Sequence, residues 1–237
     1  MDGTNREKHA RSKKPCTLIF SNQELELRPT GTVVWEAKRT LLISDLHLGK
    51  EVAFQRSAIP LPAGATSRTL SRWTQELQSG EFSRCIVLGD LLHSRIAHGA
   101  SLERDLDAFR DRHQEMEFLL VLGNHDTSSR KWLQRWKWSW VGDVYRDEGI
   151  CFVHDPLADE STEEARVGGH WHPLIQLRDN GERLKCFYEV RNRLILPSFG
   201  ELTFGKKLIR TPGDRVWGIT GSEVVELPRG VTSSAGW

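Results

Sequence analysis

The sequence predicts an α/β fold in which two mixed β-sheets pack as a sandwich with flanking helices. In the first half of the chain, short apolar runs alternate with helical patterns, and each of the central runs is followed by Asp, His or Asn. In the second half, short strand-like runs follow one another with tight turns between them. A β–α–β–α–β order makes the central strands parallel, so their carboxyl ends meet at one edge of a sheet, where ligands bind in such folds.

Helical and strand-like patterns can be separated along the first half by the spacing of their apolar residues. One helix is predicted where Leu70, Trp73 and Leu77 recur at helical spacing, and another after Ser101, whose hydroxyl suits a helix N-cap. The expected elements are strands at 16–20, 24–28, 32–35, 40–44, 84–88 and 118–122, and helices at 65–78, 102–113 and about 128–136.

The second half has a different rhythm, with short strands and no long helical pattern between them. Tight turns between such strands favour a largely antiparallel second sheet. The expected strands are 144–148, 150–153, 165–168, 174–177, 185–190 and 194–196.

Composition excludes several classes of protein. The 237 residues include 33 Lys and Arg against 32 Asp and Glu, so nucleic-acid affinity from bulk basicity is excluded, although a local basic patch is not. No apolar run approaches the roughly 20 residues that span a bilayer. The four cysteines form no CxxC pair, and the first residues lack the apolar core of a secretory signal. We therefore expect reduced thiols and a cytoplasmic protein.

Three segments are expected along the chain. Residues 1–15 read as a disordered basic tail, with a nucleic-acid-binding arm as the alternative. Residues 16–210 form the single folded domain. Residues 211–237 form a C-terminal extension, expected to contain a terminal hairpin and a flexible tail.

Polar side chains follow five of the predicted strands. His-x-His at the end of a strand places two imidazoles on the same side, because side chains alternate along a strand. Carboxylates, imidazoles and an amide oxygen, without thiolate, favour Mn²⁺, Fe or Zn²⁺ in a catalytic rather than a structural site. Two such ions roughly 3.5–4 Å apart would lower the pKa of a shared water and neutralise phosphoryl charge. The candidates are Asp45, His47, Asp90, Asn124, His125, Asp126, His154, His170 and His172.

These residues form five ordered blocks, D-x-H, G-D, G-N-H-D, H and G-H-x-H, which resemble the calcineurin-like metallophosphoesterase superfamily. The resemblance implies two divalent ions, most simply Mn²⁺, with Asp90 bridging them. It also implies that His125 contacts the phosphate and protonates the leaving oxygen, and that Asp126 orients His125. Carried over residue by residue, one ion would be held by Asp45, His47 and His172, and the other by Asn124, His154 and His170.

A closer resemblance covers most of the chain and points to the ligase-associated DNA-damage-response endonuclease group. It rests on the sequences 46–50 (LHLGK), 89–94 (GDLLHS), 169–173 (GHWHP) and 196–200 (LPSFG). Three departures concern substrate choice. Gln55-Arg56 stands where the group usually has a basic pair after the Phe. Trp171 stands where the group usually has Leu, and the glycine-rich F-T-G-G pattern is replaced by the sequence of 202–207 (LTFGKK).

Further residues near these blocks are candidates for phosphate or nucleic-acid contact. Lys50, Arg56, His93 and Arg95 follow ligand blocks, and solvated charge or a supporting role is the alternative for each. The stretch 131–140 interleaves Trp with Lys and Arg, which suits base stacking, but its spacing favours core packing.

The resemblance implies a metal-dependent phosphoesterase, most simply a DNA endonuclease of bacterial repair that works with a DNA ligase and a helicase. A phosphatase or phosphodiesterase for a small nucleotide or lipid-linked substrate is the first alternative, because the same metal site serves all of these. A non-catalytic scaffold for a ligase and helicase is the second alternative, and the intact ligand set argues against it.

Overall fold

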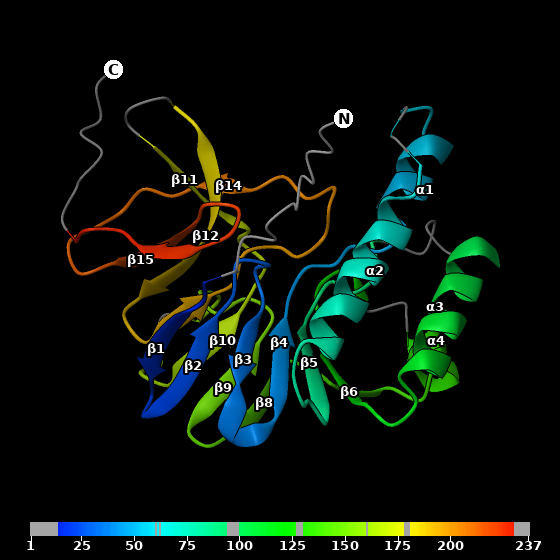
Figure 1. Cartoon of the computed structure of the whole chain (residues 1–237), viewed down its shortest axis with the longest axis horizontal. Helices are drawn as coiled ribbons and strands as arrows, with labels where there is room; N and C mark the ends of the chain where they lie inside the picture. The colour runs from blue at the N-terminus through cyan, green and yellow to red at the C-terminus, as the bar shows by residue number, and fades with distance from the viewer. Residues whose placement is uncertain are drawn as a thin grey trace, which may run out of the picture.

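The computed structural model describes residues 14–59, 61, 63–93, 100–126, 130–159, 161–177 and 181–229. Most of the predicted basic tail and the candidate Arg95 lie outside these residues. The described chain forms two sheets and a layer of helices, in the order helices, first sheet, second sheet (Figure 1). This confirms the predicted α/β sandwich.

The first sheet has the strand order β1-β2-β3-β4-β5-β6-β7. Its central and last strands, β4 to β7, pair in parallel, as the alternation of strands and helices predicts. The first four strands pair antiparallel. The bounds are β1 Cys16–Phe20, β2 Gln23–Leu27, β3 Val33–Trp35, β4 Thr40–Ile43, β5 Arg84–Leu88, β6 Glu117–Val121 and β7 Ser139–Val141.

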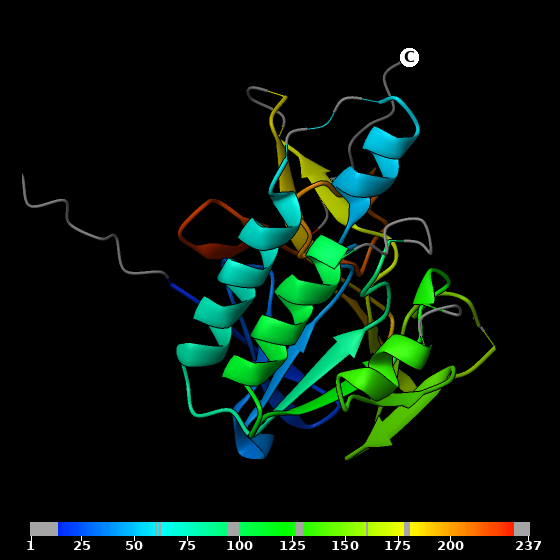
Figure 2. The same cartoon turned by 90° about the vertical axis from the view of Figure 1, so that its right-hand side faces the viewer.

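Helices α2 and α3 lie across the outer face of the first sheet and stand in front of it in Figure 2. The short helix α1 is not predicted by the sequence and follows the first ligand block directly. Its Glu51 carboxylate accepts hydrogen bonds from the backbone N and the hydroxyl of Thr66, which fixes α1 against α2. The helices are η1 Glu36–Lys38, α1 Lys50–Arg56, α2 Ala65–Gln78, α3 Ala100–Arg112 and α4 Arg130–Arg135.

The second sheet runs β14-β11-β12-β13-β10-β9-β8, and β15 joins it beside β12 with β16 at its edge. Five of its eight pairings are antiparallel, whereas β9, β10 and β13 run parallel to one another. Within the described residues no helix follows α4, so the outer helices cover the first sheet alone. The bounds are β8 Val144–Asp147, β9 Ile150–Val153, β10 Ala165–Gly168, β11 Pro173–Gln176, β12 Arg183–Val190, β13 Arg193–Ile195, β14 Lys206–Lys207, β15 Arg215–Ile219 and β16 Val224–Glu226.

Two apolar cores hold the layers together. Because side chains alternate along β4, Leu41 and Ile43 pack under the helices while Leu42 packs between the sheets. Trp136 and Trp138 are buried in the core under the helices, which confirms the packing interpretation for the Trp-rich stretch. None of the described helices combines the length and the apolar character that a membrane span needs.

Candidate metal centre

The candidate residues come from strand ends of both sheets. The strands β4, β5 and β6 of the first sheet and β9 and β10 of the second each end just before a ligand block. Backbone hydrogen bonds hold the first two blocks side by side, from His47 N to Asp90 O (2.9 Å) and from His93 N to Leu48 O (3.0 Å). Groups up to 127 positions apart in sequence are thereby brought to one edge of the sandwich.

Asp45, His47 and His172 form a cluster in which one ligand atom of each lies within 4.8 Å of the others. Asp45 is fully buried, and its Oδ1 lies 3.2 Å from Nε2 of His172. Burial lowers the pKa of His47 to about 3, so this imidazole is neutral at physiological pH. A neutral imidazole beside a buried carboxylate is a suitable pair of ligands for a divalent cation.

Asp90 occupies the centre of the site. Its Oδ2 lies 3.6 Å from Nε2 of His47, 3.6 Å from Nε2 of His154 and 3.8 Å from Nε2 of His125. It also shares a possible ligand cluster with Asp45 and His154. A carboxylate that faces imidazoles of both predicted ligand sets is placed as a bridging ligand would be.

The second ligand set gathers around His154. Its Nε2 lies 3.0 Å from Oδ1 of Asn124 and 3.0 Å from Nδ1 of His170. The other nitrogen, Nδ1, lies 3.0 Å from the carbonyl oxygen of Leu88, which can only accept, so Nδ1 carries the proton. In a neutral ring, Nε2 then has a lone pair that faces the lone pairs of the Asn124 oxygen, and these two acceptors repel each other. A cation bound by both atoms would remove this repulsion.

Several buried atoms of the site lack hydrogen-bond partners among the described residues. They are both ring nitrogens of His47 and Nδ1 of His93, together with Oδ1 of Asp45 and Nε2 of His172, which face each other at 3.2 Å without the geometry of a hydrogen bond. A buried polar atom without a partner costs about 1–3 kcal/mol of stability. Since four of these atoms belong to the Asp45 cluster, the residues present fit a divalent cation there.

The backbone at the ligands is strained. Asp45, His47, Asp90, His170 and His172 all have φ between 44° and 68°, a region that residues other than glycine adopt uncommonly. Such strain is concentrated at functional sites, where the surrounding structure enforces it.

Two glycines let the backbone approach the carboxylates closely. A Cβ at Gly169 would lie 2.1 Å from Oδ2 of Asp45, and one at Gly123 would lie 2.3 Å from Oδ1 of Asp90. The neighbouring amides use this closeness, since His170 N donates to Asp45 and His125 N donates to Asp90, both at 3.0 Å. Any side chain at these glycines would displace a carboxylate.

Of the two predicted catalytic residues, His125 lies at the mouth of the site and Asp126 is buried. His125 is 36% exposed at the mouth of the site, and its ring stacks on His93 with centroids 5.3 Å apart. Asp126 is buried, and its carboxylate accepts hydrogen bonds from the backbone N of Gly123, Leu91 and Leu92. The predicted contact of Asp126 with the His125 ring is not present in the described structure, because these amides hold the carboxylate between the loops after β5 and β6. Burial raises the pKa of Asp126 to about 7.

The predicted substrate-binding residues also differ in their burial and in their contacts with the site. Lys50 is half-buried near His47 and His93, and burial lowers its pKa. His93 touches both His47 and His125 by ring contacts, and burial lowers its pKa to about 4. Arg56 is exposed in the last turn of α1. Lys50 and His93 therefore adjoin the candidate metal ligands.

The sequence interpretation missed a supporting layer behind Asp45. The half-buried Lys185 donates to the carbonyl oxygens of Ser198 (2.6 Å) and Gly200 (3.3 Å). That segment in turn hydrogen-bonds the first block, from Gly200 N to Asp45 O (3.0 Å). Lys185 offers no ligand atom and stands in no ligand block, so spacing alone gave no signal for it.

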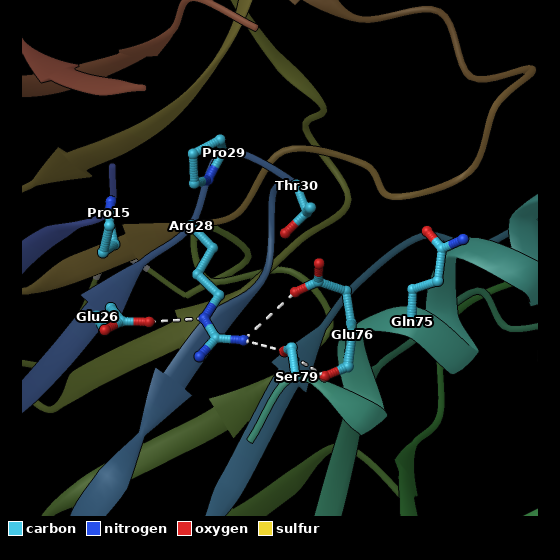
Figure 3. A pocket seen from close by; sticks show the side chains of 8 residues that line it. All are labelled: Pro15, Glu26, Arg28, Pro29, Thr30, Gln75, Glu76 and Ser79. Carbon is cyan, nitrogen blue, oxygen red and sulfur yellow. Dashed lines mark hydrogen bonds and ion pairs between the residues drawn. The ribbon is translucent and has the colours of Figure 1, made fainter. Parts of the chain in front are cut away.

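A separate cavity of about 300 Å³ lies between the first sheet and the end of α2 (Figure 3). Arg28 reaches into it and bonds to Glu26 at 2.6 Å and to the Ser79 hydroxyl at 2.6 Å, with Glu76 at 3.6 Å. Glu76 also accepts a hydrogen bond from Thr32. These charges satisfy one another, so the cavity is braced by an internal ion-pair network.

Two β-sheets with helices on one side and a mixed histidine–carboxylate site at their shared edge form the arrangement expected of a metal-dependent phosphoesterase. A family model described as calcineurin-like phosphoesterase matches residues 38–207, and the chain belongs to this family. The resemblance drawn from the sequence blocks is thereby confirmed.

Among solved structures, the crystal structure of the Pseudomonas putida nuclease MPE is similar to this chain with a TM-score of 0.77 and 27% identity. The match covers 90% of this chain and 100% of that one. A protein of unknown function from Aquifex aeolicus, AQ665, matches with a TM-score of 0.38 and 19% identity over 60% of this chain and 81% of that one. A search of curated proteins found no significant match.

Proposed function

We propose that this phosphoesterase cleaves phosphodiester bonds of DNA and uses Mn²⁺. The observation that supports this most directly is the similarity, over nearly the whole chain, to a solved nuclease. The openness of the site agrees with a polymeric substrate, since His125 and His170 are 36% and 41% exposed above the buried Asp45 and Asp90.

The divalent ions supply charge neutralisation at the phosphoryl oxygens and an activated water. Seven residues would hold them, namely Asp45, His47, Asp90, Asn124, His154, His170 and His172. His125 stands where it can contact the phosphate and give a proton to the leaving oxygen, and His93 supports its ring from behind. Nitrogen and oxygen ligands without thiolate suit Mn²⁺.

The proposal extends to the setting predicted from the sequence, a cytoplasmic bacterial repair nuclease acting with a DNA ligase and a helicase. These partners rest on the resemblance of the sequence to the ligase-associated group. A small nucleotide or lipid-linked phosphoester is the alternative substrate, because the same ions and ligands would hydrolyse it.

A gel assay of single-stranded DNA with Mn²⁺, run beside a panel of small phosphoesters, tests the proposal. We expect cleavage of DNA by the wild type and background activity for Asp90→Ala on both DNA and bis-p-nitrophenyl phosphate, with loss of bound metal. Asp143→Ala, which removes an exposed carboxylate after β7, is the matched control and should behave as wild type. Turnover of a small phosphoester with no cleavage of DNA would replace the nuclease by the alternative.

A further inference from the structure

An aromatic side chain stands almost free in solvent beside the site. Phe204 is 84% exposed, the highest value among the large apolar side chains of the described residues. It belongs to the connection from β13 to β14, where the sequence departs from the F-T-G-G pattern of the ligase-associated group. The hydrophobic effect disfavours exposing a whole phenyl ring to water, so a bound molecule that covered the face of this ring would gain free energy.

The backbone of Phe204 is fixed to a metal ligand. Its carbonyl oxygen accepts a hydrogen bond from Nδ1 of His172 at 3.0 Å, and Lys206 N donates to the carbonyl oxygen of His172 at 3.0 Å. Gly205 packs so tightly that a Cβ there would lie 2.4 Å from the carbonyl oxygen of His172. The backbone that carries the ring is therefore held beside the Asp45 cluster.

A cation lies at the same distance from this ring and from a second one. Nζ of Lys50 is 5.8 Å from the ring centroid of Phe204 and 5.8 Å from that of Phe54. The mouth of the site thus combines an exposed aromatic face with a positive charge, the two features that bind a base and its phosphate in single-stranded nucleic acid.

We propose that Phe204 stacks on the base next to the scissile phosphate of a single-stranded DNA substrate, while Lys50 binds a neighbouring phosphate. The proposal rests on the proposed nuclease function and adds a specificity residue to it. A base inside a duplex already stacks on its neighbours, so only a single strand offers a free face to the ring. The platform therefore favours single-stranded over double-stranded DNA.

The test compares two substrates and four variants, one of which is a control. One substrate is an oligothymidylate, and the other is the same oligonucleotide with abasic residues throughout, so that the phosphates are kept and the bases are removed. Phe204→Leu keeps an apolar side chain without an aromatic face, and Phe204→Tyr keeps the face. Lys50→Met removes the cation, and Ile209→Ala is a control that trims another exposed apolar side chain.

For Phe204→Leu we expect kcat/KM on oligothymidylate to fall roughly ten-fold, within the range of one stacked base, and kcat/KM on the abasic strand to stay unchanged. Phe204→Tyr and Ile209→Ala should match the wild type. Lys50→Met should lower kcat/KM on both substrates by the same factor, because both strands keep the phosphates that Lys50 would bind. Equal metal content of wild type and Phe204→Leu checks that the anchor on His172 is intact.

Two results overturn the inference while leaving the nuclease intact: wild-type cleavage of oligothymidylate by Phe204→Leu, or an equal loss on both strands. A wild type that hydrolyses bis-p-nitrophenyl phosphate but cleaves neither strand overturns the nuclease function, and the stacking role with it. The two failures are therefore distinguishable.

Discussion

The candidate ligands include a largely buried group, Asp45, His47, Asp90, His154 and His172, and two exposed members, Asn124 and His170, whereas the rim of the site is formed by His125 and Phe204. In the buried group, strained backbone and close glycines set each position, and the carboxylates accept hydrogen bonds from backbone amides. At the rim, the side chains of His125 and Phe204 are 36% and 84% exposed. We therefore expect substitutions in the buried group to weaken metal binding, and substitutions of His125 or Phe204 to change the rate and the choice of substrate.

The largest effect that would sharpen this comparison is at His125, a rim residue. His125→Ala should keep its metal content and lose roughly 10²–10⁴-fold in rate, the usual contribution of a general acid. The loss should be greatest with poor leaving groups, which need a proton, and small with p-nitrophenolate. Metal analysis together with turnover of DNA and bis-p-nitrophenyl phosphate checks this.

His113→Ala is the matched control, because His113 is a partly buried histidine that packs on Phe109 of α3. One ligand atom each of His125, His47 and Asp90 lie within 4.8 Å of one another, so these three residues could also hold an ion. Loss of metal in His125→Ala would therefore make His125 a ligand and break the division between the two groups.

The next effect concerns the backbone under the buried group. Gly169→Ala should lower metal affinity roughly 10–100-fold, the size seen when groups that orient ligands are lost, because the new methyl meets Asp45 Oδ2 at 2.1 Å. Gly142→Ala is the control, since a Cβ there has no neighbour within 4 Å. Manganese titration of both proteins measures the difference, and equal affinities would mean that Asp45 can move without cost.

Much of the fold could be predicted because local patterns decide it. The helix over 65–78 and the strands at 16–20, 84–88, 150–153 and 165–168 agree with the structure to the residue, since their apolar spacing and turns are clear. Helix α1 was missed because seven residues after a ligand block hold too few apolar positions to show a period. The parallel pairing of β9, β10 and β13 was also missed, since turns reveal which strands are adjacent in sequence but not which are adjacent in space.

The candidate ligands could be proposed from the sequence because each follows a strand and carries a metal-binding atom. Supporting residues have no such mark. Lys185 acts through two carbonyl oxygens, and the amides that hold Asp126 belong to Gly123, Leu91 and Leu92, none of which has a distinctive side chain. Their roles exist only once the chain is folded.

The smallest of the expected effects is that of replacing Lys185, the residue behind Asp45. It tests whether burying the charge of Lys185 lowers the stability of the fold. Burial lowers its pKa to about 8 from its ordinary value of 10.5, with a further contribution from Arg72 that Asp45 partly opposes. Below about pH 8 the amine is charged in both folded and unfolded chains, and the cost of burying the charge is fully present. Between about pH 8 and 10.5 the unfolded chain binds more protons than the folded one, so rising pH stabilises the fold.

The comparison of wild type with Lys185→Met isolates this residue. The free energy of unfolding of the metal-free wild type should rise relative to that of Lys185→Met from pH 8 to 10.5, as measured by urea denaturation. Lys137→Met, at an exposed lysine, should show no such trend. Metal affinity of Lys185→Met should fall less than that of Gly169→Ala, because the segment 198–200 keeps its own bonds to Ser44 and Asp45. A flat difference across this pH range would show that the amine keeps its ordinary pKa in the folded chain, and that its bonds to Ser198 and Gly200 form without a cost for burying the charge.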